Sequence, residues 1–274
     1  MIILFSLIIV VVISFFVIYK MIANPPITPA FLNNVVGNVE VDTGSGWQSA
    51  THGQELDAAD AIRTNQGSVD VYVGESLILA LTSGSEITLD TIGSAMKVTQ
   101  KWGRVWNKFT GLAGVTSYEN QMPTTKATVR GTGFLTIVDK DETVIVGEGI
   151  VDQQSPASTI SLSSDEKGIY NGTLVKAELT LLETQEVKDQ MKMDIERLKT
   201  LRRHLLSKNQ FLVGTVKKTY GLSDSDVESY LAKIDTGELN DADLLSQAPF
   251  KAEVLTRIKA LNDEIKQQMK IANE

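Results

Sequence analysis

The apolar residues of the chain follow three patterns, one after another. Residues 1–19 are apolar apart from two serines and carry no charged side chain. From residue 35 to about 154, short runs alternate apolar and polar side chains, with glycine and aspartate between the runs. Beyond residue 174 the apolar positions recur mostly at steps of three and four. These patterns predict a membrane-spanning helix, then a set of β-strands, then a set of α-helices.

The first apolar segment is long enough to cross a bilayer. At about 1.5 Å per residue, a helix of this length reaches about the 30 Å of a hydrocarbon core. No Lys or Arg precedes it, and Asn24-Pro25-Pro26 is a poor cleavage site, so an uncleaved anchor over residues 1–20 is favoured over a signal peptide. Its apolar side chains include Ile2, Leu4, Phe5, Ile9, Val12, Phe16 and Tyr19.

The anchor suggests where the rest of the chain lies. Flanking charge barely discriminates the orientation, because the α-amino group and Lys20 lie on opposite sides of the segment. An N-terminal anchor favours an extracytoplasmic body, periplasmic or at the cell surface. Residues 21–33 contain Pro25, Pro26 and Pro29, and they are expected to form a semi-rigid linker.

Residues 34–154 are expected to form an all-β domain. Strand patterns occur at residues 35–41, 69–73, 77–81, 86–89, 133–138 and 143–146. Turn residues every 8 to 12 positions are typical of a sandwich, a barrel or a solenoid, and we expect a sandwich or a short β-roll or solenoid. The polar segment from Asp139 to Glu142 predicts a hairpin turn between two of the strands.

A series of motifs in this segment resembles the FecR-type (ferric-citrate regulator) domain. The match covers residues 37–152 and departs from the family at Ala59 and Met122, where glycine and threonine are usual. The residues that carry it are Trp47, Gly53, Leu56, Asp60, Ile62, Arg63, Thr64, Pro123, Val129, Arg130, Gly131, Thr132, Phe134, Glu148 and Gly149. The resemblance implies a role in envelope sensing or protein–protein contact and supplies no catalytic residue. In the best-known members an anti-sigma segment precedes the membrane helix. Here the predicted helix starts at residue 2, so the signalling role is not transferred.

Most of these motif residues are expected to be structural. Gly131 and Gly133 flank a strand entry, where a positive φ or close backbone approach is expected. Arg130 could form a fork with a turn carboxylate such as Asp60, or with carbonyls at a strand end. An alternative is that Arg63 and Arg130 hold an anionic ligand. The aromatic side chains expected in the core are Trp47, Trp102, Trp106 and Phe134.

The last third is expected to be helical. Residues 155–173 are assigned to a linker, and residues 174–274 to a coiled-coil-like hairpin or bundle. Ser223 is expected to cap one short helix, Asn240 or Asp241 another, and Gly237 to end a helix at C′. The charged residues between 183 and 208 are expected to form a solvated face. The predicted helix interface, within the chain or with a partner chain, comprises Leu181, Met191, Ile195, Leu198, Leu205, Val254, Ile258, Leu261 and Ile265.

Composition narrows the chemistry. The chain has no cysteine, which excludes disulfides and thiolate sites, and only two histidines, His52 and His204. A net charge of −8 argues against nucleic-acid binding. Asp139, Asp141 and Glu142 could supply calcium ligands, as could Asp57 and Asp60. Neither cluster has the spacing of an EF-hand, so solvated turn carboxylates are favoured. We therefore predict no catalytic, cofactor or metal site.

The sequence favours a membrane-anchored interaction, scaffold or envelope-assembly subunit without catalysis. Its expected partners are the membrane, other envelope proteins and further copies of the chain, with no nucleic acid. Two alternatives stay open. One is a small-ligand or glycan-binding envelope module. The other, less favoured, is a hydrolase that uses two carboxylates. Asn171-Gly172-Thr173 matches a glycosylation sequon, which matters only in an exported body.

Overall fold

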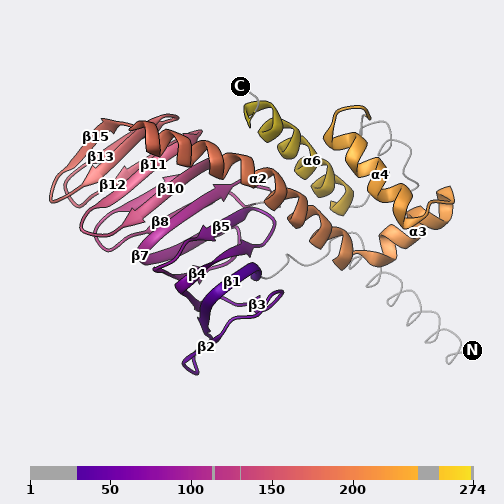
Figure 1. The fold of residues 1–274 in the computed structure, drawn as a ribbon, viewed down its shortest axis with the longest axis horizontal. Coiled ribbons are helices and arrows are strands. Elements are labelled where there is room, and N and C mark those ends of the chain that lie inside the picture. Colours follow the sequence, from indigo (N-terminus) through magenta and orange to yellow (C-terminus); the bar gives the residue numbers. More distant parts are fainter. Residues whose placement is uncertain (1–29, 113–114, 130, 240–252, 273–274) are drawn as a thin grey trace, which may run out of the picture. The chain divides into compact units, whose positions relative to one another are not determined.

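The structure is a computed structural model that describes residues 30–112, 115–129, 131–239 and 253–272 (Figure 1). The chain divides into two compact units. We call residues 28–197 the β unit and residues 198–270 the helical unit. The predicted anchor lies outside the described residues. Among the helices that the structure does describe, none is long and apolar enough to cross a membrane.

The β unit consists mainly of one sheet of fifteen strands (Figure 1). The strands are β1 (Ala30–Asp42), β2 (Trp47–Ser49), β3 (Glu55–Leu56), β4 (Ala61–Val73), β5 (Leu77–Leu81), β6 (Ser85–Thr91), β7 (Ala95–Phe109), β8 (Ser117–Gln121), β9 (Lys126–Val129), β10 (Thr132–Val138), β11 (Glu142–Glu148), β12 (Ile150–Gln154), β13 (Thr159–Ser163), β14 (Glu166–Tyr170) and β15 (Leu174–Glu178).

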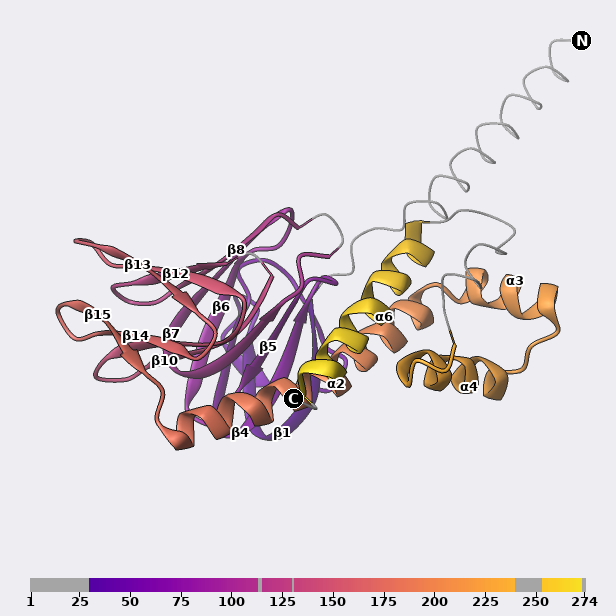
Figure 2. The ribbon, with the colours of Figure 1, turned by 90° about the horizontal axis from the view of Figure 1, so that it is seen from above.

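This sheet folds over into two layers because long strands contribute to both. Residues 95–102 of β7 pair with β6 and, in parallel, with β8, whereas residues 103–109 pair with β5 and β10. Strand β4 likewise pairs with β6 through its first part and with β5 through its last. One layer continues through β9, β12 and β13, and the other through β11, β14 and β15. Figure 2 shows β12 and β13 in one layer and β14 and β15 in the other.

Glycines permit the bends in these strands. Gly103 has φ +92°, and a Cβ there would lie 2.4 Å from backbone and side-chain atoms of Ser85. Gly37 and Gly67 pair across β1 and β4, and a Cβ on Gly67 would lie 2.0 Å from the carbonyl oxygen of Val36. No real Cβ contact is that short, so only glycine allows the two backbones to approach this closely.

The core fills the space between the layers with aliphatic and aromatic side chains. It also holds a buried polar network. The Tyr118 hydroxyl donates to Asn107 Oδ1 at 2.6 Å, and Asn120 Nδ2 donates to Gln100 Oε1 at 3.3 Å and Thr136 Oγ1 at 3.2 Å. Burial raises the pKa of Tyr118 well above its ordinary value, so the phenol stays protonated and donates.

The structure confirms a mostly β fold with a helical C-terminal region. The six predicted strand patterns lie in β1, β4, β5, β6, β10 and β11, and the predicted hairpin joins β10 to β11. The assignment of residues 155–173 to a linker is wrong, because β13 and β14 lie there. Helix also does not begin at Leu174, which belongs to β15. The alternating pattern of Thr159–Ser163 was the available signal for another strand.

Four helices are described after the strands: α2 (Leu181–Lys208), α3 (Gln210–Tyr220), α4 (Asp224–Asp235) and α6 (Glu253–Ala272). Ser223 caps α4 in a capping box with Asp226, as predicted. Gly237 follows the C-cap with φ +77°, also as predicted. The predicted cap at Asn240 or Asp241 lies outside the described residues.

The helical unit has its own core and one buried charge cluster. Its buried apolar residues are Leu198, Leu201, Leu205, Leu231, Ile234, Val254, Ile258, Leu261 and Ile265. Among them, Arg202 Nη1 donates to Asp235 Oδ1 at 2.6 Å and to Asn262 Oδ1 at 2.8 Å. This arginine therefore joins residues of α2, α4 and α6.

Candidate functional site: the junction of helix α2 with the sheet

The N-terminal part of α2, residues 181–197, packs on the outer face of one sheet layer. Val187 and Met191 contact a cluster of Ala80, Trp106, Leu135 and Ile145, which belong to β5, β7, β10 and β11. Gly147 leaves room for the helix, since a Cβ there would lie 2.6 Å from Val187 Cγ1. Met191, predicted to lie in a helix–helix interface, therefore packs against the sheet.

A capping box fixes where α2 begins. The Thr180 N–H donates to Glu183 Oε2 at 2.7 Å, and the Glu183 N–H donates to Thr180 Oγ1 at 3.3 Å. Lys167 Nζ, on β14, donates to the same carboxylate at 2.7 Å. Partial burial raises the pKa of Glu183, but the hydrogen bonds from Lys167 and Thr180 outweigh it and leave that pKa below its ordinary value. The first turn of α2 is thus tied to the sheet by an ionised carboxylate.

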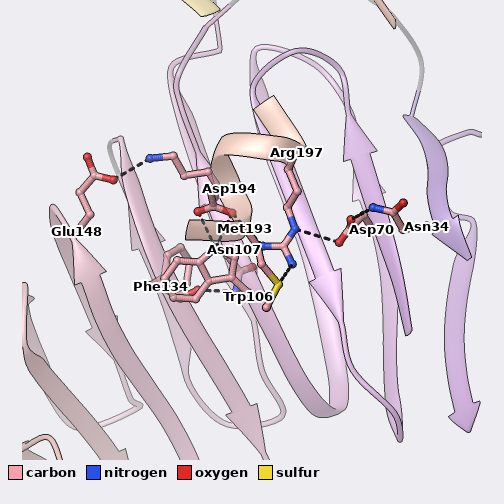
Figure 3. A network of polar contacts seen from close by, with 10 residues as sticks. Asn34, Asp70, Trp106, Asn107, Phe134, Glu148, Met193, Asp194 and Arg197 are labelled. Atoms are coloured by element: carbon pink, nitrogen blue, oxygen red, sulfur yellow. Dashed lines mark hydrogen bonds and ion pairs between the residues drawn. The ribbon is translucent and has the colours of Figure 1, made fainter. Parts of the chain in front are cut away.

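A buried charge cluster lies further along the helix (Figure 3). Trp106 Nε1 donates to both carboxylate oxygens of Asp194, at 3.0 and 2.9 Å. Arg197 Nη1 donates to Asp194 Oδ1 at 3.0 Å, and Arg197 Nε donates to Asp70 Oδ1, on β4, at 3.1 Å. Asn34 Nδ2 completes the chain by donating to Asp70 Oδ2 at 2.6 Å. We call Asp70, Trp106, Asp194 and Arg197 the junction cluster.

Burial and charge oppose one another in this cluster. The Asp194 side chain is fully buried, and Arg197 and Asp70 side chains are 8% and 9% exposed. Burial raises the pKa of Asp194 above its ordinary value, against the attraction of Arg197 and Lys108. Burial lowers the pKa of Arg197, but Asp70 and Asp194 outweigh it and raise that pKa, so the guanidinium stays charged.

A second ion pair, with a buried lysine, lies close to the cluster. Lys108 Nζ donates to Glu148 Oε2 at 2.7 Å, and the Lys108 side chain is 2% exposed (Figure 3). Glu148, a motif residue, thus has a structural partner in β7. The ionisable groups under α2 form ion pairs and hydrogen bonds with one another, so this arrangement holds a helix on a sheet.

The sequence-based expectation for two residues of the junction cluster is wrong. Asp194 and Arg197 were expected on a solvated helix face, yet both are buried. Asp70 and Lys108 were not singled out at all. A charged residue is rarely buried without a partner, but Asp70 and Arg197 are 127 positions apart, so spacing in one sequence gives no signal of the pairing.

Of the expected core aromatics, two are buried and two are not. Trp106 and Phe134 are 1% and 0% exposed, whereas Trp102 is 48% exposed and Trp47 is half-buried. The Arg63 guanidinium lies 4.2 Å from the centre of the Trp47 ring. Trp47 therefore packs beneath a charged side chain instead of filling the core.

The alternative of an anionic ligand on Arg63 and Arg130 gains no support from Arg63. Arg63 Nε donates to Glu40 Oε2 at 2.7 Å, so this guanidinium already has an anionic partner. Arg130 lies outside the described residues, and its predicted fork with Asp60 lies there too. Asp60 Oδ2 accepts a hydrogen bond from the Asp57 N–H at 2.8 Å and so stabilises its own turn.

The second half of the motif series meets at one strand entry. Gly131 has φ +61°, and Gly149 has φ +82° with a Cβ position 2.6 Å from the Gly131 carbonyl oxygen. Thr132 is buried beside them. Gly133 instead needs space, because a Cβ would lie 3.0 Å from the Trp106 ring. The expected positive φ is confirmed at Gly131, whereas the expectation for Gly133 is wrong, because its close neighbour is a side chain and not the backbone.

The remaining motif residues lie on the strands and turns of the β unit. Leu56, Ile62, Thr64 and Val129 are buried, whereas Gly53 and Pro123 lie exposed in turns. The described motif residues therefore lie along the strands and turns that support the β unit.

The candidate calcium ligands of the 139–142 segment do not gather around a common point. Glu142 is 6% exposed and accepts hydrogen bonds from the Thr124 and Thr125 N–H groups, each at 2.7 Å. It was expected to be a solvated turn carboxylate, but its side chain caps a loop. Asp139 and Asp141 are exposed. In the part of the chain that the structure describes, no three His, Asp or Glu side chains gather as a metal site.

The predicted helix interface divides into three groups. Leu181 is 91% exposed and contributes no packing, and Ile195 is half-buried. Met191 contacts the sheet. The others belong to the core of the helical unit: Leu198, Leu205, Val254, Ile258, Leu261 and Ile265.

Solved structures that are similar to part of this chain exist, but the similarity is weak. No protein-family model and no curated protein matches the chain. Two crystal structures from Parabacteroides distasonis, at 1.65 and 2.50 Å and described as a "putative anti-sigma factor", are similar to part of it. In each, identity is 19%, the match covers 43% of this chain and 59% of that chain, and the TM-score is 0.39. A likeness at this level carries no inference about function, so the FecR-type resemblance stays a prediction from sequence motifs.

Proposed function

We propose that this chain is a membrane-anchored, extracytoplasmic protein with a FecR-type β domain, and that it acts by contacting other proteins, without catalysis. It would serve as a scaffold, assembly or sensing subunit of the cell envelope. The hydrophobic segment at residues 1–19 supplies the proposed anchor. The FecR-type motifs supply the proposed class of the β domain.

One observation supports the absence of catalysis in this proposal: the largely buried ionisable groups of the β unit bind one another or the backbone. Asp194 binds the Trp106 indole and Arg197, and Glu142 caps a loop. Lys108 and Glu148 bind each other. Catalytic acids and bases must reach a substrate. These groups instead form hydrogen bonds and ion pairs that stabilise the fold.

Purification of the full-length chain from membranes in a mild detergent tests this proposal. Co-purifying proteins are identified by mass spectrometry after chemical cross-linking in the intact membrane. The expected result is a reproducible partner or further copies of the chain. Turnover of an envelope polymer that is abolished by a single carboxylate-to-amide substitution would refute the non-catalytic reading and favour the hydrolase.

Topology can be tested separately, because the chain contains no cysteine. A single cysteine at the exposed position Thr51 (Thr51→Cys) would react with a membrane-impermeant maleimide in intact cells if the body is extracytoplasmic. Labelling that requires permeabilised membranes would contradict that location.

A further inference from the structure

The helical unit contains a groove between the end of α2, α3 and α4. Its volume is about 460 Å³. Leu206, Val213 and Val227 supply its apolar lining, and Gly214 lies among them. All of its described lining residues lie between 206 and 228, and the groove is large enough for an inserted side chain.

Gly214 is unusual because no described neighbour requires a glycine there. It lies inside α3, where glycine is less favourable than alanine. Its φ is not in the left-handed region, and a Cβ there would meet no described atom within 4 Å. The space above Gly214 is thus kept open at some cost to the helix, which suits close approach by another chain.

An exposed aromatic side chain lies one turn before this opening. Phe211 is 72% exposed, and it is three residues from Gly214 on the same helix. Residues three apart are neighbours on a helix surface. Single exposed apolar residues are common, but here a protruding phenyl ring and an open groove lie side by side on one helix.

The charges of this surface suit a second copy of the chain. Residues 206–228 contain three lysines and three acidic residues, a net charge of zero, whereas the whole chain carries −8. Exposed Lys218 lies on α3 and exposed Glu228 lies on α4, whereas Asp224 already pairs with Lys217 within the chain. A strongly acidic or basic surface would repel a copy of itself, while this mixed one can pair with a rotated copy.

We propose that α3 docks against α3 of a second copy, with Phe211 of each copy inserted above Gly214 of the other. In an antiparallel pair centred between residues 212 and 213, position 211 of one helix faces position 214 of the other. The contact is isologous and closes a dimer. The proposal deepens the interaction role proposed above by naming one partner, a second copy, and the surface that binds it.

The test measures the mass of the full-length chain in detergent by light scattering over a dilution series, with the micelle mass subtracted. Phe211→Ala removes the inserted ring, and Gly214→Leu fills the groove with a better helix former. The double variant Phe211→Gly, Gly214→Phe exchanges ring and opening. Leu182→Ala, which truncates an 83% exposed side chain on α2, is the matched control.

The wild type and the Leu182 control are expected to form a concentration-dependent dimer. Each single variant at 211 or 214 is expected to raise the dissociation constant at least tenfold, and the exchanged variant to restore dimerisation. Circular dichroism checks that every variant is folded. The exchange and Gly214→Leu are read together. Loss of fold would not predict rescue by the exchange, and surface hydrophobicity alone would predict that Gly214→Leu strengthens the dimer instead of weakening it.

Three results would overturn the proposal. The first is a wild type that is monomeric at about 100 µM, a concentration at which a dimer of micromolar affinity would form. The second is a pair of single variants that dimerise like the wild type. The third is an exchanged variant that is folded but stays monomeric. If the chain is monomeric but is cross-linked to other envelope proteins in membranes, the proposed dimer surface is refuted and the proposed interaction role still holds.

Discussion

Replacement of Arg197 by methionine is the most informative perturbation of the β unit. Methionine retains much of the aliphatic packing but removes the cation shared by Asp70 and Asp194. Breaking a buried ion pair by removing one partner costs about 3–5 kcal/mol. Asp194 keeps the Trp106 N–H, and Asp70 keeps Asn34 Nδ2, so we expect about 3 kcal/mol, the lower end of that range. This is a large share of the roughly 5–15 kcal/mol of a typical domain.

The matched control is Arg104→Met. Arg104 also pairs with a carboxylate on α2, that of Glu186, but these two side chains are 39% and 33% exposed. Exposed pairs contribute about 0–1 kcal/mol. Denaturant unfolding of the full-length chain, followed by tryptophan fluorescence in a background with Trp47 and Trp102 replaced by phenylalanine, reports the transition of the β unit through Trp106. If Arg197→Met costs no more than Arg104→Met, the reasoning from burial is refuted.

The same variant has an expected pH dependence. Loss of the guanidinium removes an attraction that opposes burial, so the pKa of Asp194 in the folded variant rises further. A carboxyl whose folded-state pKa exceeds its unfolded value contributes stability at low pH and loses it as pH rises through the folded-state pKa. The stability lost by Arg197→Met should therefore be largest at neutral pH and shrink on acidification. A constant loss from pH 7 to pH 4 would contradict this account.

Further predictions concern single positions in the β unit. Gly67→Ala should cost about 3 kcal/mol or more, because its Cβ would lie 2.0 Å from a backbone oxygen of β1. The control Gly93→Ala, whose Cβ would meet no described atom within 4 Å, should leave the melting temperature in thermal unfolding nearly unchanged. Gly147→Val should cost about 1–3 kcal/mol by overpacking against α2, and an unchanged melting temperature would refute that packing. The pKa of Glu166 should be about 2 by NMR titration, lowered first by the Ser163 N–H. Its stabilisation is present above about pH 4.5 and lost as pH falls toward 2, and an ordinary value would contradict the hydrogen bonds.

The fold class was readable from the sequence because alternation and turn residues are local signals. In β10, the mostly apolar run from Phe134 to Val138 and the polar turn after it predict one strand and the turn of a hairpin. The start of α2 was readable too, since Thr180 and Glu183 have the spacing of a capping box. The assignment of helix from Leu174 missed that signal.

The packing of α2 on the outer face of the sheet could not be predicted from the sequence. In β5 all five residues are buried, because the core covers one face and α2 covers the other. Trp106 and Trp102 look alike in sequence, yet only Trp106 lies beneath the helix. An apolar stripe on a helix shows that something covers it but not what, so Met191 could be assigned to a helix–helix contact when its partner was a sheet.

The central claim, a non-catalytic role in contacting other envelope proteins, is tested most directly by site-specific photo-cross-linking in intact membranes. A photoreactive amino acid is placed at the exposed positions Trp102 and Val175 of the β unit and Phe211 of the helical unit. The account predicts reproducible adducts that depend on the site, with Phe211 linking to a second copy. A chain that forms no adduct from any of these positions and purifies alone as a monomer would contradict it.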